Sequence, residues 1–210
     1  MIIEPLFSNF IASDIVDVDC DKITKYIKTV EPGLPLRLDT PELSDIVDYV
    51  NSKIHVFAKE YGLMSKAKPR LTTMWSNRNN AREPLKPHIH GTHWISIVFY
   101  PEADVNSPDL IIKNPITEIM EYACPYQYQE YATQYNRGRI TISPKKGLMV
   151  AFPAWCQHWV DPECPFDSTR YSLAFNITCS HISDSYIEHI YAPNSGFAEL
   201  YSKIQGQDPL

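Results

Sequence analysis

Three of the seven histidines in this 210-residue chain, His88, His90 and His93, lie within six consecutive residues. Side chains at positions i and i+2 of an extended segment point to the same side. His88 and His90 are therefore expected to project together, with Ile89 facing the core. Two neighbouring imidazoles can bind one divalent metal ion. His93 has the opposite parity from His90 and is expected to point elsewhere; taken alone, a His-x-His pair is more often found on a surface loop.

A second set of polar residues follows later in the chain. Residues 147–160 have the pattern of a hydrophobic strand that ends in Phe-Pro, a turn, and a second strand that carries His158. Arg170 and Ser172 share one strand parity, so both side chains can point into one cavity. A guanidinium binds a carboxylate through two parallel hydrogen bonds, and a serine hydroxyl can add a third.

Taken together, the His-x-His segment, the Gly-x-x-x-x-Phe-Pro turn, the distal histidine and the Arg-x-Ser pair resemble the iron(II)/2-oxoglutarate oxygenase superfamily. In particular they resemble a small branch of it that is common in marine bacteria and phages. The resemblance spans residues 75–176, and the N-terminal strand and helices are also where that family places them. It implies a dioxygenase that uses iron(II), 2-oxoglutarate and O2 to hydroxylate a substrate that the sequence does not identify.

The resemblance implies a metal site with one departure from the usual pattern. His88 and His158 match the two metal-binding histidines, but His90 occupies the position where the superfamily usually has Asp or Glu. Three-histidine iron sites occur among related cupin dioxygenases, so we expect His88, His90 and His158 to be the metal ligands. Asp109 and Asp161 are the alternative sources of a carboxylate.

The resemblance also implies a 2-oxoglutarate site. Arg170 matches the basic residue that pairs with the distal carboxylate, and Ser172 matches its hydroxyl partner. Tyr100 closes the strand after the His-x-His motif, where related prolyl hydroxylases carry a tyrosine that contacts the same carboxylate. Asn77 lies on the preceding strand and is a further candidate cofactor-binding residue.

Two other classes of function fit the same residues. One is a cupin-like three-histidine metal enzyme that does not use 2-oxoglutarate, such as a dioxygenase acting directly on a chelating substrate, or a zinc enzyme. The other is a non-catalytic jelly-roll binding module. Replacing Arg170 by Ala should abolish the turnover of 2-oxoglutarate but spare the metal chemistry of a three-histidine enzyme that does not use it. A non-catalytic binding module, in contrast, should have no tight metal site.

Short strands are expected to position these residues. An edge strand is expected at residues 2–11 and a short helix at 21–30. Thr40 and Pro41 begin an apolar stripe with helical spacing that ends at Gly62, and such a helix should pack on a sheet. The tyrosine-rich segment 115–136 is expected to be a long loop or short helix, and is the best candidate for a substrate-facing lid. Seven β-rich runs are predicted as strands, at residues 71–76, 94–100, 109–113, 139–143, 148–152, 156–160 and 171–179.

Length and composition fit one globular domain, with 44% apolar residues, 21% charged residues and a net charge of −6. The chain lacks a basic stripe, which argues against nucleic acid as a partner. The sequence has five cysteines but no CxxC pair, and it shows no secretory segment, so we expect a cytoplasmic protein with free thiols. If the protein is phage-encoded, the expected location is the host cytoplasm. No apolar run reaches about 18 residues, so no membrane association is expected.

The strand pattern predicts a mainly β (α+β) chain with a sandwich or barrel. The resemblance implies that this fold is a double-stranded β-helix, which is a cupin-like jelly roll. We expect one domain over residues 1–210, with an N-terminal strand and helices packed outside (1–68), a jelly-roll core (69–180) and a C-terminal extension (181–210). The expected substrate is a small molecule or a protein side chain. Homodimers are common among such small oxygenases, so a homodimer is a further expectation.

Overall fold

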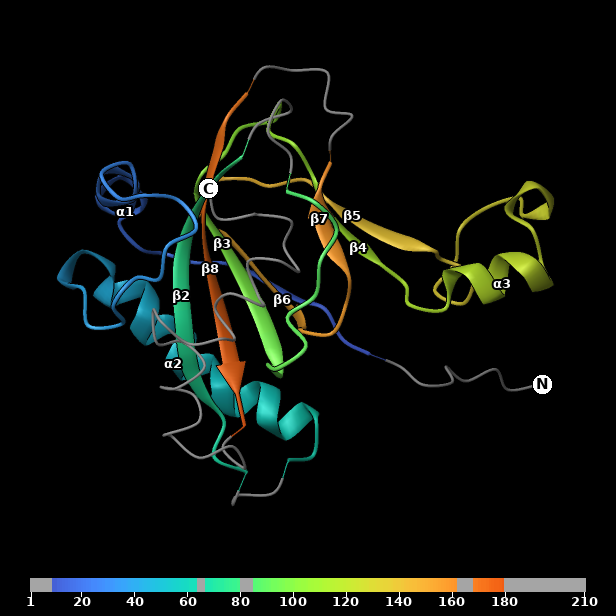
Figure 1. Cartoon of the computed structure of the whole chain (residues 1–210), viewed down its shortest axis with the longest axis horizontal. Helices are drawn as coiled ribbons and strands as arrows, with labels where there is room; N and C mark the ends of the chain where they lie inside the picture. Colours follow the sequence, from blue (N-terminus) through green and yellow to red (C-terminus); the bar gives the residue numbers. More distant parts are fainter. Residues whose placement is uncertain (1–8, 64–66, 80–84, 162–167, 180–210) are drawn as a thin grey trace, which may run out of the picture.

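The computed structural model describes residues 9–63, 67–79, 85–161 and 168–179. Within these ranges the strands form two antiparallel sheets, a major sheet in the order β1-β6-β3-β8-β2 and a minor sheet in the order β5-β4-β7 (Figure 1). The two-sheet arrangement confirms the predicted mainly β jelly roll. The strands are β1 (Ala12–Ile15), β2 (Arg70–Asn79), β3 (Ile95–Glu102), β4 (Leu110–Lys113), β5 (Arg139–Ile142), β6 (Leu148–Pro153), β7 (His158–Val160) and β8 (Arg170–Thr178).

All seven predicted strand segments contain a strand, and the largest difference in their bounds is at β2. The sequence predicts an end at residue 76, but β2 continues to Asn79. Its last residues pair with β8, so that Asn77 lies opposite Ser172 and Asn79 opposite Arg170. Pairing with a long central strand extends β2 through residues whose type alone would favour a turn.

The predicted N-terminal edge strand lies later than expected. Residues 9–11 are not part of a strand, residues 2–8 lie outside the described ranges, and the strand β1 runs over Ala12–Ile15. β1 pairs with β6 at the edge of the major sheet. The strand predicted at residues 2–11 is therefore absent from residues 9–11, and the rest of that prediction lies outside the described ranges.

Two helices cover the outer face of the major sheet. Helix α1 (Cys20–Ile27) begins after Asp19, whose carboxylate accepts a hydrogen bond from the Lys22 amide at 2.9 Å. It ends three residues before the predicted end, where the Thr29 hydroxyl donates to the carbonyl of Tyr26 at 2.7 Å. None of the helices in the described part of the chain has the length and hydrophobicity needed to span a membrane.

Helix α2 (Ser44–Glu60) is the predicted amphipathic helix, with a different beginning. Thr40 does not cap it; its hydroxyl donates to the carbonyl of Arg37 at 2.7 Å, and a 3₁₀ turn, η1 (Pro41–Leu43), comes first. At the other end Gly62 has φ +64°, the left-handed conformation that favours glycine after a helix, as predicted. The buried stripe is Ile46, Val47, Val50, Ile54 and Phe57.

The jelly roll has two apolar clusters because its central strands are buried on both faces. Phe99, Leu173 and Phe175 point outward and pack with α1 and α2 in the larger cluster. Tyr100, Val150 and Phe152 have the opposite parity and lie in the smaller cluster, between the two sheets. Polar residues on the inner face of β8 are therefore enclosed by the barrel.

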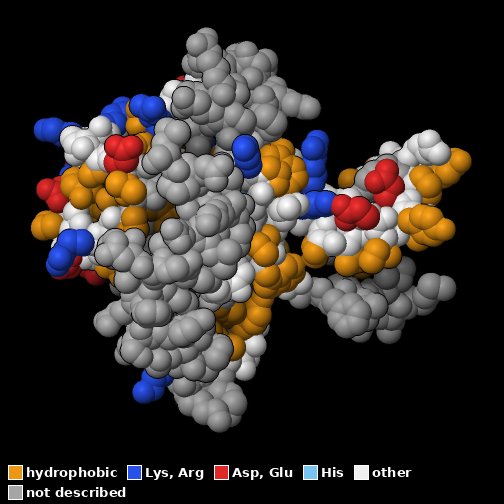
Figure 2. Space-filling view, viewed as in Figure 1, with side chains coloured by type: hydrophobic (Ala, Val, Ile, Leu, Met, Phe, Trp, Pro, Cys, Tyr) orange, Lys and Arg blue, Asp and Glu red, His pale blue; other side chains and the backbone are white. Residues whose placement is uncertain are grey.

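The tyrosine-rich segment projects from the minor sheet as an arm that contains α3 (Thr117–Ala123) and a 3₁₀ turn, η3 (Tyr126–Tyr128). Helix α3 buries none of its side chains, and Tyr122 is 93% exposed. Figure 2 shows hydrophobic side chains over the surface of this arm, and Figure 1 places α3 away from the body. In this conformation the arm does not cover the space between the sheets, which is where a lid was expected.

Removing the Phe175 ring should destabilise the fold strongly. Phe175 is fully buried between the major sheet and the helices, and a Phe→Ala change at such a position costs about 3–5 kcal/mol of unfolding free energy. Urea unfolding followed by circular dichroism measures the change. The control, Val105→Ala, alters a side chain that is 96% exposed and should leave the unfolding free energy almost unchanged. Similar losses for both variants would contradict this packing.

Candidate metal centre

The His-x-His segment lies beside β7 at the open edge of the minor sheet. The His88 amide donates to the carbonyl of His158 at 3.1 Å, and the His158 amide donates back to His88 at 3.0 Å. Two residues later, the His90 amide donates to the carbonyl of Ala154 at 2.8 Å. Backbone pairing thus brings the early histidines next to the distal histidine, as the sequence pattern predicted.

One prediction about this segment was wrong. Ile89 was expected to face the core, but its side chain is 49% exposed, whereas His90 is 4% exposed. The alternation is as predicted, but the enclosed side of the segment is the one that carries the histidines. His93 points elsewhere, as expected, and its Nδ1 lies 2.8 Å from the hydroxyl of Thr178.

The rings of His88, His90 and His158 form a compact cluster. Their centroids are 4.3 Å apart for His88 and His158, and 5.1 Å apart for each of the other two pairs. One ring nitrogen from each residue lies within 4.8 Å of those of the other two. In the described ranges this is the one group of three or more potential ligands with such spacing. The arrangement suits a single divalent metal ion.

Backbone carbonyls fix the tautomers of two of the histidines. The Nδ1 of His88 lies 2.8 Å from the carbonyl oxygen of Lys86, and the Nδ1 of His158 lies 2.9 Å from that of Cys156. A carbonyl can only accept a hydrogen bond, so each Nδ1 carries the proton. Each Nε2 then has a free lone pair for a metal ion.

His90 is oriented by side chains. Its Nδ1 lies 2.8 Å from Oδ1 of Asn176 and 3.1 Å from the hydroxyl of Ser96, which itself donates to Oδ1 of Asn176 at 2.9 Å. The Nε2 of His90 is buried and has no hydrogen-bond partner among the described residues. Burying a ring nitrogen without a hydrogen-bond partner lowers the stability of the fold. A metal ion held by the three Nε2 atoms would give this nitrogen a partner.

Burial keeps these imidazoles neutral. It lowers the pKa of His88, that of His158 falls well below its usual value, and that of His90 falls to about 3. The neighbouring histidines lower the pKa of His90 and His158 further, because two imidazolium ions would repel each other. Neutral imidazole is the form that binds metal.

A buried cation lies further along the inner face of β8. Arg170 is 2% exposed, and its Nη1 donates to the carbonyl of Pro108 at 2.7 Å. Its guanidinium carbon lies 5.0 Å from the centroid of the Tyr100 ring. Among the described residues, Nε of Arg170 and the hydroxyl of Tyr100 make no hydrogen bond. Burial raises the pKa of the Tyr100 hydroxyl, so that it stays a donor.

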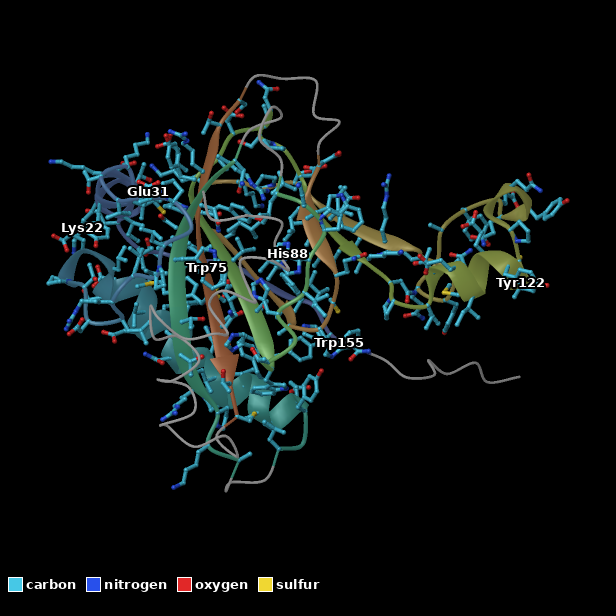
Figure 3. All side chains as sticks on the ribbon, in the orientation of Figure 1. Lys22, Glu31, Trp75, His88, Tyr122 and Trp155 are labelled. Carbon is cyan, nitrogen blue, oxygen red and sulfur yellow. The ribbon has the colours of Figure 1, made fainter. Side chains whose placement is uncertain are left out.

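Ser172 and Asn77 line the same space. Ser172 is 1% exposed and has the same parity as Arg170. Asn77 is its register partner on β2, and Trp75, two residues earlier on the same face, lies with its ring centroid 5.4 Å from that of His90. Figure 3 shows Trp75 and His88 in the body of the molecule, between the sheets, far from Tyr122 on the arm. All the predicted site residues therefore face the space between the sheets.

No carboxylate belongs to the histidine cluster in the described part of the chain. Asp109 and Asp161 are half-buried residues whose backbones pair with each other, through the Asp161 amide and the Asp109 carbonyl at 2.9 Å. The described residues include no buried Asp or Glu at all. The buried formal charge of this region is the guanidinium of Arg170.

Sequence reasoning missed two residues of the site, Asn176 and Ser96. Asn176 could have been predicted from its position, because Arg170, Ser172 and Asn176 are separated by even numbers of residues and therefore lie on the same face of one strand. Ser96 gave no such signal, because it lies opposite Asn176 only through the pairing of β3 with β8.

Comparison with known proteins points to one family. Residues 73–176 match the model of the family described as "Putative 2OG-Fe(II) oxygenase". No curated protein sequence matches the chain. The matched segment contains the three histidines, Tyr100, Arg170 and all but the last two residues of β8.

Several solved structures share the fold. HygX from Streptomyces hygroscopicus, solved with nickel and 2-oxoglutarate bound, aligns with a TM-score of 0.53 and 8% identity over 82% of this chain and 83% of HygX. A Pseudomonas putida prolyl-4-hydroxylase aligns with a TM-score of 0.52 and 10% identity over 82% of this chain and 87% of the hydroxylase. The chain spans 59% of a 2OG-Fe(II) oxygenase family oxidoreductase from Burkholderia pseudomallei, with 68% of this chain covered, a TM-score of 0.47 and 13% identity.

The metal-free protein should lose stability as the pH falls below about 6.5. Because the cluster histidines have lower pKa values in the folded than in the unfolded chain, protons bind the unfolded chain first in this range. For His90, whose pKa is about 3 in place of 6.5, the loss between pH 6.5 and about pH 5 is about 2 kcal/mol. Urea unfolding in the presence of a chelator, at pH values on either side of 6.5, measures it.

The control separates this effect from general acid sensitivity. His90→Gln should reduce the pH dependence of stability, whereas His55→Gln, at an exposed position on α2, should leave it unchanged. Identical pH dependence in wild type and His90→Gln would contradict the buried, neutral state of His90.

Proposed function

Because this chain belongs to the iron(II)/2-oxoglutarate oxygenase superfamily, we propose that it is a dioxygenase whose iron(II) is held by His88, His90 and His158 and whose 2-oxoglutarate is anchored by Arg170. The enzyme hydroxylates a C–H bond of its substrate. One atom of O2 enters the product, and the other enters the succinate that 2-oxoglutarate yields with release of CO2.

The observation that carries this proposal is the unpaired charge of Arg170. The guanidinium is buried on the inner face of β8, and it forms no salt bridge within the described ranges. A buried cation without a counter-ion is costly, and a carboxylate that enters from solvent would relieve that cost. The Tyr100 hydroxyl, also buried and unpaired among the described residues, is a second donor for the same carboxylate.

The histidines support the other half of the proposal. Bound iron(II) supplies the activation of O2, and the three Nε2 lone pairs are the donors that would hold it. Their Nδ1 protons are directed to oxygen acceptors, so the rings are oriented before a metal ion arrives. Val150 and Phe152 line the inside of the barrel and exclude water from the space between the sheets.

The distal carboxylate of 2-oxoglutarate is oriented by residues of three strands. Arg170 and Ser172 on β8 and Tyr100 on β3 supply donors, and Asn77 on β2 can supply a further one. Positioning by several strands of one barrel fixes the keto acid relative to the histidines. Such rigid placement reduces the entropy cost of assembling the reacting groups.

One observation favours a second candidate, a three-histidine metal enzyme that does not use 2-oxoglutarate. The cluster has no carboxylate ligand in the described part of the chain, and three neutral imidazoles leave a divalent metal with its full charge of +2. A substrate that chelates the metal directly would balance that charge without Arg170. A small-molecule or protein side-chain substrate, a homodimer and a cytoplasmic location remain predictions.

Removing the Arg170 guanidinium should weaken 2-oxoglutarate binding by about 30- to 5,000-fold, because truncating one partner of a buried charge pair costs about 2–5 kcal/mol. Calorimetric titration of 2-oxoglutarate into manganese(II)-loaded protein measures the change. Arg170→Lys keeps the charge but lacks the planar fork, and should bind with intermediate affinity.

Arg78→Ala is the matched control, since Arg78 lies on the adjacent strand β2 but is exposed. Its affinity for 2-oxoglutarate should equal that of wild type. If Arg170→Ala binds manganese(II) and 2-oxoglutarate as tightly as wild type, the 2-oxoglutarate proposal is wrong and the second candidate is the better account.

A further inference from the structure

We propose that Asn176 and Ser96 are positioning residues that make a histidine at position 90 work as the third metal ligand in place of a carboxylate. This inference rests on the metal site of the proposed function. It goes beyond that site by assigning a role to two buried residues that are not members of the histidine cluster.

A histidine differs from a carboxylate in what it requires to be a ligand. An ionised carboxylate offers two equivalent oxygens in either orientation, whereas a neutral imidazole has one lone pair, and its position depends on the tautomer. For His88 and His158, backbone carbonyls within two residues select the tautomer. His90 has no such local acceptor for its Nδ1, and its partners are the side chains of Asn176 and Ser96.

The three side chains form a closed network. Ser96 on β3 and Asn176 on β8 are direct register partners, and both are buried. The Ser96 hydroxyl donates to Oδ1 of Asn176 at 2.9 Å, and the same oxygen lies 2.8 Å from Nδ1 of His90. The amide oxygen therefore accepts two hydrogen bonds. This arrangement holds the proton on Nδ1 and leaves the lone pair on Nε2.

The surroundings of the Nε2 atom of His90 support this role. The atom is buried and has no hydrogen-bond partner among the described residues, although each Nδ1 of the cluster has one. Rotation of the ring, or a proton on Nε2, would remove the third donor from the cluster. The network is thus a specific requirement of the histidine, and an Asp or Glu at position 90 would not need it.

Thr178 provides a matched comparison on the same face of the same strand. It is also buried, and its hydroxyl lies 2.8 Å from Nδ1 of His93 and 2.9 Å from the hydroxyl of Thr72. His93 is not a member of the metal cluster. Thr178→Val therefore removes a partly buried hydrogen bond to a histidine that is not a proposed ligand.

The test is the affinity of the metal-free protein for cobalt(II) alone, read from its visible absorption bands in competition with a chelator. Asn176→Leu, which keeps the approximate shape but loses the acceptor, should bind about 10–100-fold more weakly than wild type. Asn176→Asp keeps the acceptor and should restore affinity to near the wild-type value. Ser96→Ala should show a smaller loss, and Thr178→Val should show none. Circular dichroism checks that each variant is folded.

Three results would overturn the inference. They are wild-type affinity in Asn176→Leu, equal losses in Asn176→Leu and Thr178→Val, or a folded Asn176→Asp that binds as weakly as Asn176→Leu. If Asn176→Asp does not fold, wild-type affinity in Ser96→Ala overturns the role of the network. Failure of the proposed function is distinct, since it would appear as a wild-type protein that binds no cobalt(II), or one that binds it but not 2-oxoglutarate.

Discussion

Burying three imidazoles together is the constraint on which the rest of this structure depends. The rings, whose centroids are 4.3–5.1 Å apart, are held uncharged because burial disfavours the charged form, and two imidazolium ions at that distance would also repel each other. Each ring must also satisfy one nitrogen and leave the other open. The fold meets this condition with two backbone carbonyls and one asparagine, so the rings are already oriented as a metal ion would require.

The charge of the site follows from the same choice of ligands. A divalent metal on three neutral histidines keeps a charge of +2, and the buried Arg170 adds +1 with no buried acid nearby among the described residues. A dicarboxylate lowers the total to +1, whereas the superfamily's usual carboxylate ligand would bring it to zero. In the proposed site, a neutral His90 in place of a carboxylate would therefore strengthen the attraction for anionic ligands. It also makes the orientation of one ring a new requirement.

Much of this site could be predicted from the sequence, because its main signals are local. His88 and His90 alternate along one segment, Arg170 and Ser172 alternate along another, and strand parity is a property of neighbouring residues. The partners of His90 could not be predicted, since Ser96 and Asn176 meet only through the register of β3 and β8. The predicted direction of Ile89 was wrong for a related reason. Alternation shows that neighbouring side chains lie on opposite faces of the segment, but which face is enclosed depends on how the strands assemble into the barrel.

On the proposed function, one site binds a metal ion on three histidines and 2-oxoglutarate on the same metal. Anaerobic titration of iron(II) and 2-oxoglutarate into the purified protein tests it most directly, because the chelated complex has a weak visible charge-transfer band. We expect the band in wild type and its loss in His90→Ala. A wild-type protein that binds iron(II) without the band would contradict the 2-oxoglutarate site, and a band that persists in His90→Ala would contradict the three-histidine site.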